Sequence, residues 1–237
     1  MFELLIKPNK AEKKPWEMFF VGAFYATLAL ILVRWIFSKD PVLSRYSGLL
    51  VVTFTVMFCI PFIYFSMRKE EKKDMELTGF KRLMKEHSKA LLYLMFLFLG
   101  FVVAYSFWYI AIADGNQNFK AQIETYCMIN KPSNYNECVN QFYGVEGAKT
   151  TGFLTVTDKV VNIFANNIYV LIFTLVFSLI FGAGAIFILA WNASVISAAI
   201  GIFSKADLAN LPIGLSRYMI HGIPEIAAYF AGALAGV

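Results

Sequence analysis

The chain has 237 residues, of which 59% are hydrophobic and only 16% are charged. A soluble domain usually carries about 45–50% apolar and about 25% charged residues, and the mean hydropathy of +0.61 points the same way. These values exclude an ordinary soluble domain and predict an all-α, polytopic transmembrane helical bundle. The net charge of +5 does not indicate nucleic-acid binding, because the basic residues cluster just outside apolar runs, as the positive-inside rule expects.

Three apolar runs in the first half of the chain are long enough to cross a bilayer, which takes about 20 helical residues. The runs are 19–37, 46–67 and 90–113. Trp16 and Trp35 bracket the first run, as aromatic belts do. Pro61 is expected to kink the second run. The polar N-terminus has no small-residue cleavage site, so the first helix should remain as an anchor. Residues 1–113 are thus predicted as an N-terminal three-span region.

The most charged stretch is 68–89, with eight basic and five acidic residues and a net charge of +3. Its second half has apolar residues at helical spacing, so it either lies on the membrane as an amphipathic helix or forms a solvated linker helix. This basic loop and the N-terminus fall on one side, which the positive-inside rule makes cytoplasmic. The nearly neutral segment 114–158 is then a long extracellular loop. We expect a multi-pass protein of the cell membrane with a cytoplasmic N-terminus.

Cys127 and Cys138 lie in the predicted extracellular loop, with ten residues between them. A pair of cysteines in an oxidising compartment favours a disulfide, and this loop has little apolar mass to order it otherwise. Two free thiols are the alternative. We predict no metal site here, because two further ligands are missing and the loop has no histidine.

The segment 159–237 is predicted as a C-terminal membrane region, which gives about six membrane segments in all. Residues 160–203 are apolar throughout and are too long for one ordinary span. Two helices broken near Gly182 are favoured, and one tilted helix followed by a re-entrant piece around Asn192 is the alternative. The last apolar run, 222–237, has 16 residues, which is short for a span, and it ends without a flanking charge.

Four amides interrupt the apolar runs of this region. They are Asn162, Asn166, Asn167 and Asn192. Amides in a membrane are unfavourable unless they are hydrogen-bonded across helices. We therefore predict interhelical hydrogen bonds, with a polar pathway as the alternative.

The strongest constellation is Arg217, His221 and Glu225, which a spacing of four places on one face of a continuous helix. Gly222 and Pro224 argue against continuity, and Pro224 is typical of the first turn of a new helix. Glu225 would then lie where the helix dipole favours a carboxylate. We predict a loop-to-helix junction at the membrane edge, which either holds a structural Glu–Arg or Glu–His bond or is a functional site.

The sequence HGIPEIAAYFAGALAG at 221–236 follows an Asn-rich opening, ANNIYV at 165–170, then the glycines at 182–184 and Asn192. In this order the residues resemble the stage II sporulation protein M family, over about 160–237. The resemblance implies a multi-spanning membrane protein of bacteria or archaea. In spore formers, relatives act with peptidoglycan-degrading partners during engulfment. His221, Gly222 and Glu225 carry over, and no catalytic role comes with them.

We expect a non-enzymatic scaffold or assembly partner in the cell envelope, in contact with the lipid bilayer and with itself or another membrane protein. No cofactor, metal or catalytic residue is predicted. A hydrolase that uses His221 and Glu225 is disfavoured, because metal hydrolysis needs about three protein ligands and the one other histidine is His87. The alternative is a small-molecule or ion transporter or channel whose polar site combines Asn166, Asn167, Asn192, Arg217 and Glu225.

Overall fold

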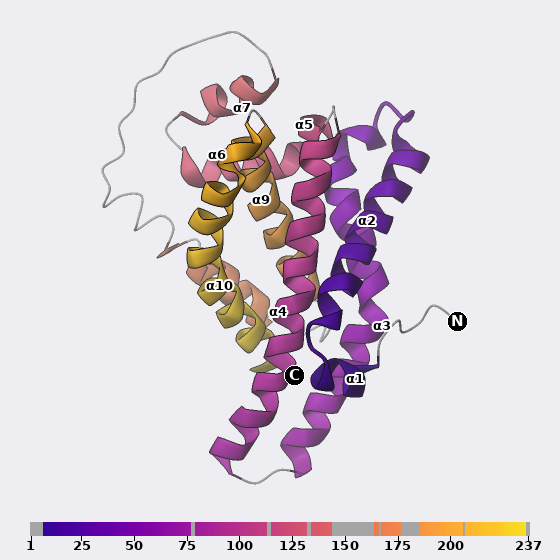
Figure 1. Cartoon of the computed structure of the whole chain (residues 1–237), viewed down its shortest axis with the longest axis vertical. Helices are drawn as coiled ribbons and strands as arrows, with labels where there is room; N and C mark the ends of the chain where they lie inside the picture. Colours follow the sequence, from indigo (N-terminus) through magenta and orange to yellow (C-terminus); the bar gives the residue numbers. More distant parts are fainter. Residues whose placement is uncertain are drawn as a thin grey trace.

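The computed structural model describes residues 7–76, 79–112, 115–131, 134–143, 164–165, 167–176, 185–205 and 207–235. The α-helices labelled in Figure 1 are α1 (Pro8–Lys13), α2 (Glu17–Phe37), α3 (Ser47–Glu76), α4 (Phe80–Ala111), α5 (Gly115–Asn118), α6 (Lys120–Asn130), α7 (Tyr135–Tyr143), α9 (Ala185–Lys205) and α10 (Leu211–Ala235). Short 3₁₀ turns at Leu43–Tyr46 and Leu208–Asn210 precede α3 and α10. Every regular element in the described ranges is helical, which confirms the predicted all-α class.

Four of these helices are long and apolar enough to cross a membrane. They span Glu17–Phe37, Leu43–Lys73, Met84–Ala111 and Ile186–Lys205. A shorter apolar helix, Asn167–Val176, lies where a fifth segment is predicted. The described chain therefore has four candidate membrane spans, and the count of six membrane segments stays a prediction.

Helix α4 lies in the middle of the bundle, with α2 and α3 on one side and α9 and α10 on the other (Figure 1). Its contact with α2 is the most extensive between helices in the described chain. Glycines permit this close approach. A Cβ atom on Gly22 would overlap the carbonyl oxygen of Leu97, and one on Gly100 would overlap that of Phe19. Small residues allow helix backbones in membranes to approach in this way.

Helices α3 and α4 extend beyond the other helices at the bottom of Figure 1. Their 30 and 32 residues span about 45 and 48 Å, whereas the hydrocarbon core of a bilayer is about 30 Å thick. The basic stretch 68–89 thus continues both spanning helices, with residues 77–78 outside the described chain. The predicted amphipathic helix on the membrane surface is wrong, because α4 runs without interruption from Phe80 through its candidate span. Gly79 caps α4 at φ +104°, which suits glycine.

The segment after α4 is helical rather than an open loop where it is described. Helices α5, α6 and α7 lie at the top of Figure 1, at the opposite end from the α3–α4 tip. Cys127 on α6 and Cys138 on α7 form a disulfide with an S–S distance of 2.02 Å, which confirms the predicted pairing. Tyr109 of α4 donates a hydrogen bond to Asn116 of α5 (2.8 Å), and Asn116 donates to the carbonyl of Phe142 in α7 (3.0 Å). Residues 144–163 lie outside the described chain.

The apolar stretch 160–203 contains two described helices, Asn167–Val176 and α9. The predicted break at Gly182 and Gly184, and the predicted polar residues Asn162 and Asn166, lie outside the described residues.

Helix α10 corrects the predicted loop-to-helix junction. It begins at Leu211 and passes through Gly222, Pro224 and Glu225 to Ala235 without a break. An internal proline removes one backbone hydrogen bond, but helices that pack in a membrane tolerate this because neighbouring groups satisfy the freed carbonyl. Pro61 lies inside α3 in the same way. The junction was inferred from local backbone preference, which tertiary packing overrides here.

Candidate functional site

The continuous α10 places Arg217, His221 and Glu225 at helix positions i, i+4 and i+8, which share one face. The side chains of Arg217 and His221 lie outside the described part of the chain. Glu225 is half-buried and accepts a hydrogen bond of 2.6 Å from the hydroxyl of Tyr229, one turn later. The predicted Glu–Arg or Glu–His bond therefore stays a prediction. Gly222 is buried and Pro224 is exposed.

Asn192 and Asn167 are the predicted intramembrane amides that the structure describes. Asn192 Nδ2 donates to the carbonyl oxygen of Ile188, 2.8 Å away, within its own helix. The hydrogen bond of Asn192 therefore runs within α9, and the predicted bond across helices stays a prediction. Asn167 begins the shorter apolar helix and is half-buried.

The hydrogen bonds that do cross between helices come from other residues. Gln122 of α6 is fully buried, and its Nε2 donates to the carbonyl of Gly48 in α3 (3.0 Å) and to Ser194 Oγ in α9 (3.2 Å). This one side chain therefore ties α6 to two helices that are candidate spans. Sequence reasoning missed it, because a single glutamine in a polar segment carries no sign that it is buried.

Two further bonds lie deeper in the bundle. Tyr105 of α4 donates to Thr55 Oγ1 of α3 at 2.7 Å, and Ser197 of α9 donates to the carbonyl of Val102 in α4 at 3.0 Å. All three side chains are buried. These two hydrogen bonds thus join α4 to α3 and to α9 inside the bundle.

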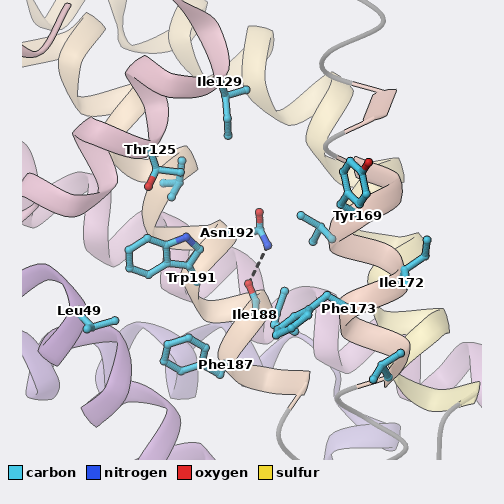
Figure 2. Close-up of a pocket in the computed structure, with 13 residues that line it drawn as sticks. Leu49, Thr125, Ile129, Tyr169, Ile172, Phe173, Phe187, Ile188, Trp191 and Asn192 are labelled. Atoms are coloured by element: carbon cyan, nitrogen blue, oxygen red, sulfur yellow. Dashed lines mark hydrogen bonds between the residues drawn. The ribbon is translucent and has the colours of Figure 1, made fainter. Parts of the chain in front are cut away.

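A cavity of about 640 Å³ lies between α9, the helix Asn167–Val176, the start of α3 and α6 (Figure 2). Its walls are largely apolar and aromatic, with Phe187 and Trp191 from α9 and Tyr169 and Phe173 from the shorter helix. Asn192 points into it, as Figure 2 shows. Cavities of about 300–1,000 Å³ with apolar walls and few polar groups are the usual form of small-molecule sites.

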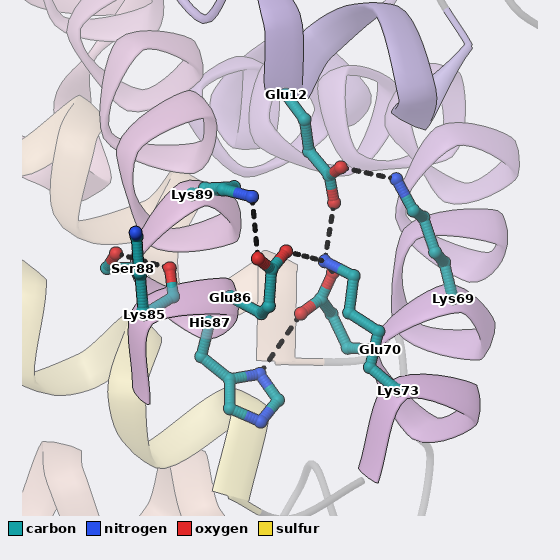
Figure 3. Close-up of polar contacts among 9 residues, drawn as sticks. All are labelled: Glu12, Lys69, Glu70, Lys73, Lys85, Glu86, His87, Ser88 and Lys89. Carbon is teal, nitrogen blue, oxygen red and sulfur yellow. Dashed lines mark hydrogen bonds and ion pairs between the residues drawn. The ribbon is translucent and has the colours of Figure 1, made fainter. Parts of the chain in front are cut away.

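An ion cluster ties α1 to the projecting ends of α3 and α4 (Figure 3). Glu12 of α1 lies 2.6 Å from Lys69 Nζ and 2.6 Å from Lys73 Nζ, both on α3. Burial alone would raise the pKa of Glu12, but the hydrogen bonds and positive charges of the two lysines outweigh it and hold that pKa below its usual value. Glu12 is therefore ionised at neutral pH.

The cluster continues to α4 through Glu70, whose side chain is only 2% exposed. Lys73 Nζ lies 2.9 Å from Glu70 Oε1, and His87 Nδ1 of α4 lies 3.0 Å from Glu70 Oε2. Glu86 of α4 adds contacts of 3.8 Å to Lys73 and 2.7 Å to Lys89. These acidic side chains turn inward, between the helices. The sequence could not reveal the cluster, because its members come from three helices that only the fold brings together.

Among the described residues, no group of three His, Cys, Asp or Glu side chains is arranged to hold a metal ion. The chemistry that the described site residues offer is hydrogen bonding and ion pairing.

Comparison with known families matches residues 89–237 to the family described as stage II sporulation protein M. The match begins within α4 and includes every later helix that the structure describes. It therefore extends beyond the sequence resemblance, which covers only about 160–237. No curated protein and no solved structure matches the chain. Because the family match covers more than half of the sequence, the chain belongs to the stage II sporulation protein M family.

Proposed function

We propose that the chain is a non-enzymatic membrane protein that acts as an assembly partner in the cell envelope. The observation that carries this proposal is the use of the polar groups in the spanning helices. Tyr105 and Ser197 are buried in spanning helices and donate hydrogen bonds to neighbouring helices, and the buried Gln122 of α6 donates to two spanning helices. Groups that line a transport pathway need access to water, whereas these groups build a rigid bundle.

The two ends of the bundle offer surfaces to a partner. At the predicted cytoplasmic end, the ion cluster takes up Glu12, Glu70 and Glu86. The basic side chains at the start of α4 are exposed, namely Lys81, Arg82 and Lys85. This part of α4 stands beyond the hydrocarbon core, because its 32 residues exceed the length that a bilayer needs. At the other end, the disulfide and Asn116 hold α6 and α7 in a fixed helical layer.

Site-specific photo-crosslinking in the native host tests the proposal. A benzophenone amino acid at Arg82 should cross-link one discrete protein, and the triple change Lys81→Glu, Arg82→Glu, Lys85→Glu should abolish co-purification of that protein. The matched control carries the cross-linker at Phe107, which is 60% exposed on the membrane part of α4. If position 82 yields the same products as position 107, the assembly proposal is wrong.

Transport remains the alternative, and the observation that favours it is Asn192, which lines the cavity. Proteoliposomes that contain the pure chain distinguish the two functions. Under the assembly proposal, potassium and sodium fluxes should equal those of empty vesicles. A flux that Asn192→Leu abolishes would replace assembly by transport.

A further inference from the structure

The cavity beside α9 is a groove among apolar helices whose lining side chains remain uncovered. Tyr169 is 73% exposed and Phe173 is 55% exposed, although both line it. Its other walls come from two candidate spans, α9 and the start of α3. In a membrane, such a groove is filled either by another protein or by lipid.

The shape of the walls argues against a protein helix. Helices dock in membranes through small residues that let the backbones approach, whereas the groove presents Phe187, Trp191 and Val195 from α9 and aromatic rings from the opposite wall. A helix with its side chains is about 10 Å across, and bulky walls hold it away from the groove floor. A flexible hydrocarbon chain fits between such side chains without requiring a flat or small-residue face.

The upper end of the groove in Figure 2 is closed by α6, which contributes Thr125 and Ile129. Thr125 donates its hydroxyl hydrogen to the carbonyl of Ala121 at 2.8 Å, and its oxygen can still accept a hydrogen bond. The roof is also fixed in place, because Gln122 bonds to α9 and Cys127 is bonded to α7.

The polar atoms of the groove lie toward the same end. In Figure 2 the oxygen of Asn192 points toward Ile129 of α6 and the hydroxyl of Tyr169 also lies at the upper end, whereas Phe187 and Phe173 lie at the lower end. Asn192 Nδ2 is already used by Ile188, which leaves Asn192 Oδ1 facing the groove. This polarity matches a molecule with an apolar tail and a polar head, oriented with its head near α6.

We infer that the groove binds the hydrocarbon tail of one membrane lipid, with the polar end of the lipid toward α6. This inference does not depend on the assembly function. It assigns a lipid site to helices whose role is otherwise structural.

Fluorescence quenching by brominated lipid tests the inference, because bromine quenches tryptophan at contact range and Trp191 lies in the groove wall. The full chain with Trp16, Trp35 and Trp108 changed to Phe is titrated in detergent micelles with phosphatidylcholine that carries a dibrominated acyl chain. Quenching of Trp191 should saturate at one lipid per chain. A second chain that retains Trp35 alone, which is 79% exposed, should show quenching that only follows the bulk lipid fraction.

A pair of matched variants tests whether the groove itself holds the lipid. Val195→Phe adds a ring at a half-buried lining position and should abolish the saturable phase. Val103→Phe makes the same change at a side chain of α4 that is 44% exposed and is not part of the groove lining, and should leave the phase intact. Unchanged reactivity of the buried Cys59 reports that each variant is folded.

Two results would overturn the inference. One is quenching of Trp191 that is no steeper than that of Trp35. The other is an unquenched Trp191 in a chain that is dimeric by light scattering and becomes monomeric with Val195→Phe, which would make the groove an interface between copies. If Val195→Phe fails to fold, the comparison of Trp191 with Trp35 still decides the question.

Discussion

The glycine contact between α2 and α4 gives a prediction whose size follows from the backbone alone. Changing Gly100 to Ala adds a Cβ that overlaps the carbonyl oxygen of Phe19 and lies 2.8 Å from Ala23 N and 3.1 Å from Gly22 Cα. Ordinary contacts between carbon atoms lie at about 3.5–4.0 Å. All three neighbours are backbone atoms, so no rotamer change relieves the clash and the two helices must move apart.

The expected cost is the difference of two effects. Overpacking of this kind typically costs about 1–3 kcal/mol, and an immovable backbone places the cost of Gly100→Ala at about 3 kcal/mol. Alanine in place of glycine inside a helix returns about 1 kcal/mol. The net destabilisation is then about 2 kcal/mol, which corresponds to a fall in Tm of roughly 4–8 °C for a chain of this size.

Cys59 provides the assay, because it is the free cysteine of the chain and is fully buried in α3. A thiol-reactive fluorogenic dye should report its exposure at a lower temperature in Gly100→Ala than in the parent. The matched control is Gly222→Ala in α10, where the new Cβ meets only the Cδ1 of Ile196, at the ordinary distance of 3.6 Å. Gly222→Ala should keep or raise Tm. A Gly100→Ala chain as stable as its parent would show that α2 and α4 do not pack through these glycines.

Three further outcomes are expected. Changing Cys127 and Cys138 together to Ser should cost about 2–4 kcal/mol, a typical value for a native disulfide, and should raise hydrogen exchange in α6 and α7 but not in α2. Protection of α1 from hydrogen exchange should be complete at neutral pH and should fall as the pH drops through the lowered pKa of Glu12, because protonation removes its ion pairs. Glu12→Gln should weaken this protection at neutral pH. If α1 exchanges at the same rate after both changes, the ion cluster does not hold α1 in place. Glu225→Gln should lower Tm in detergent, because it weakens the 2.6 Å bond from Tyr229, whereas unchanged Tm with lost function in cells would make Glu225 a functional residue.

Features that depend on local pattern were predictable from the sequence. Helix α2 follows from one apolar run with Trp16 and Trp35 at its ends, because length and hydropathy alone specify a spanning helix. The disulfide between Cys127 and Cys138 follows from the presence of two cysteines in one predicted extracellular segment. Both inferences need no knowledge of how distant parts of the chain meet.

The errors arise where tertiary contacts outweigh local preference. Pro224 and Gly222 indicated a helix start, yet α10 continues through both, because packing determines whether a membrane helix tolerates a proline. The segment after α4 is polar by composition, but its described part forms short helices around the buried Gln122. The inward-facing Glu12 and Glu70 carry no local mark that separates them from solvated charges.

The signature of the candidate site was recognised from the sequence, but its geometry was not. The spacing of Arg217, His221 and Glu225 placed them on one helix face only under the assumption of a continuous helix. The bond from Tyr229 to Glu225 was not foreseen, although a spacing of four on a helix is a signal that could have found it.

The central position of α4 has a consequence for the biogenesis of the protein. Translation completes α2, α3 and α4 before the residues of α9 exist, so the glycine contact between α2 and α4 can close while the opposite side of α4 still faces lipid. The hydrogen bonds from Ser197 to the carbonyl of Val102 and from Gln122 to Ser194 can form only after the later helices insert. Cysteine oxidation between α6 and α7 involves only residues made before α9. The order of synthesis therefore allows the disulfide between α6 and α7 to form before α9 and α10 pack against the first half of the bundle.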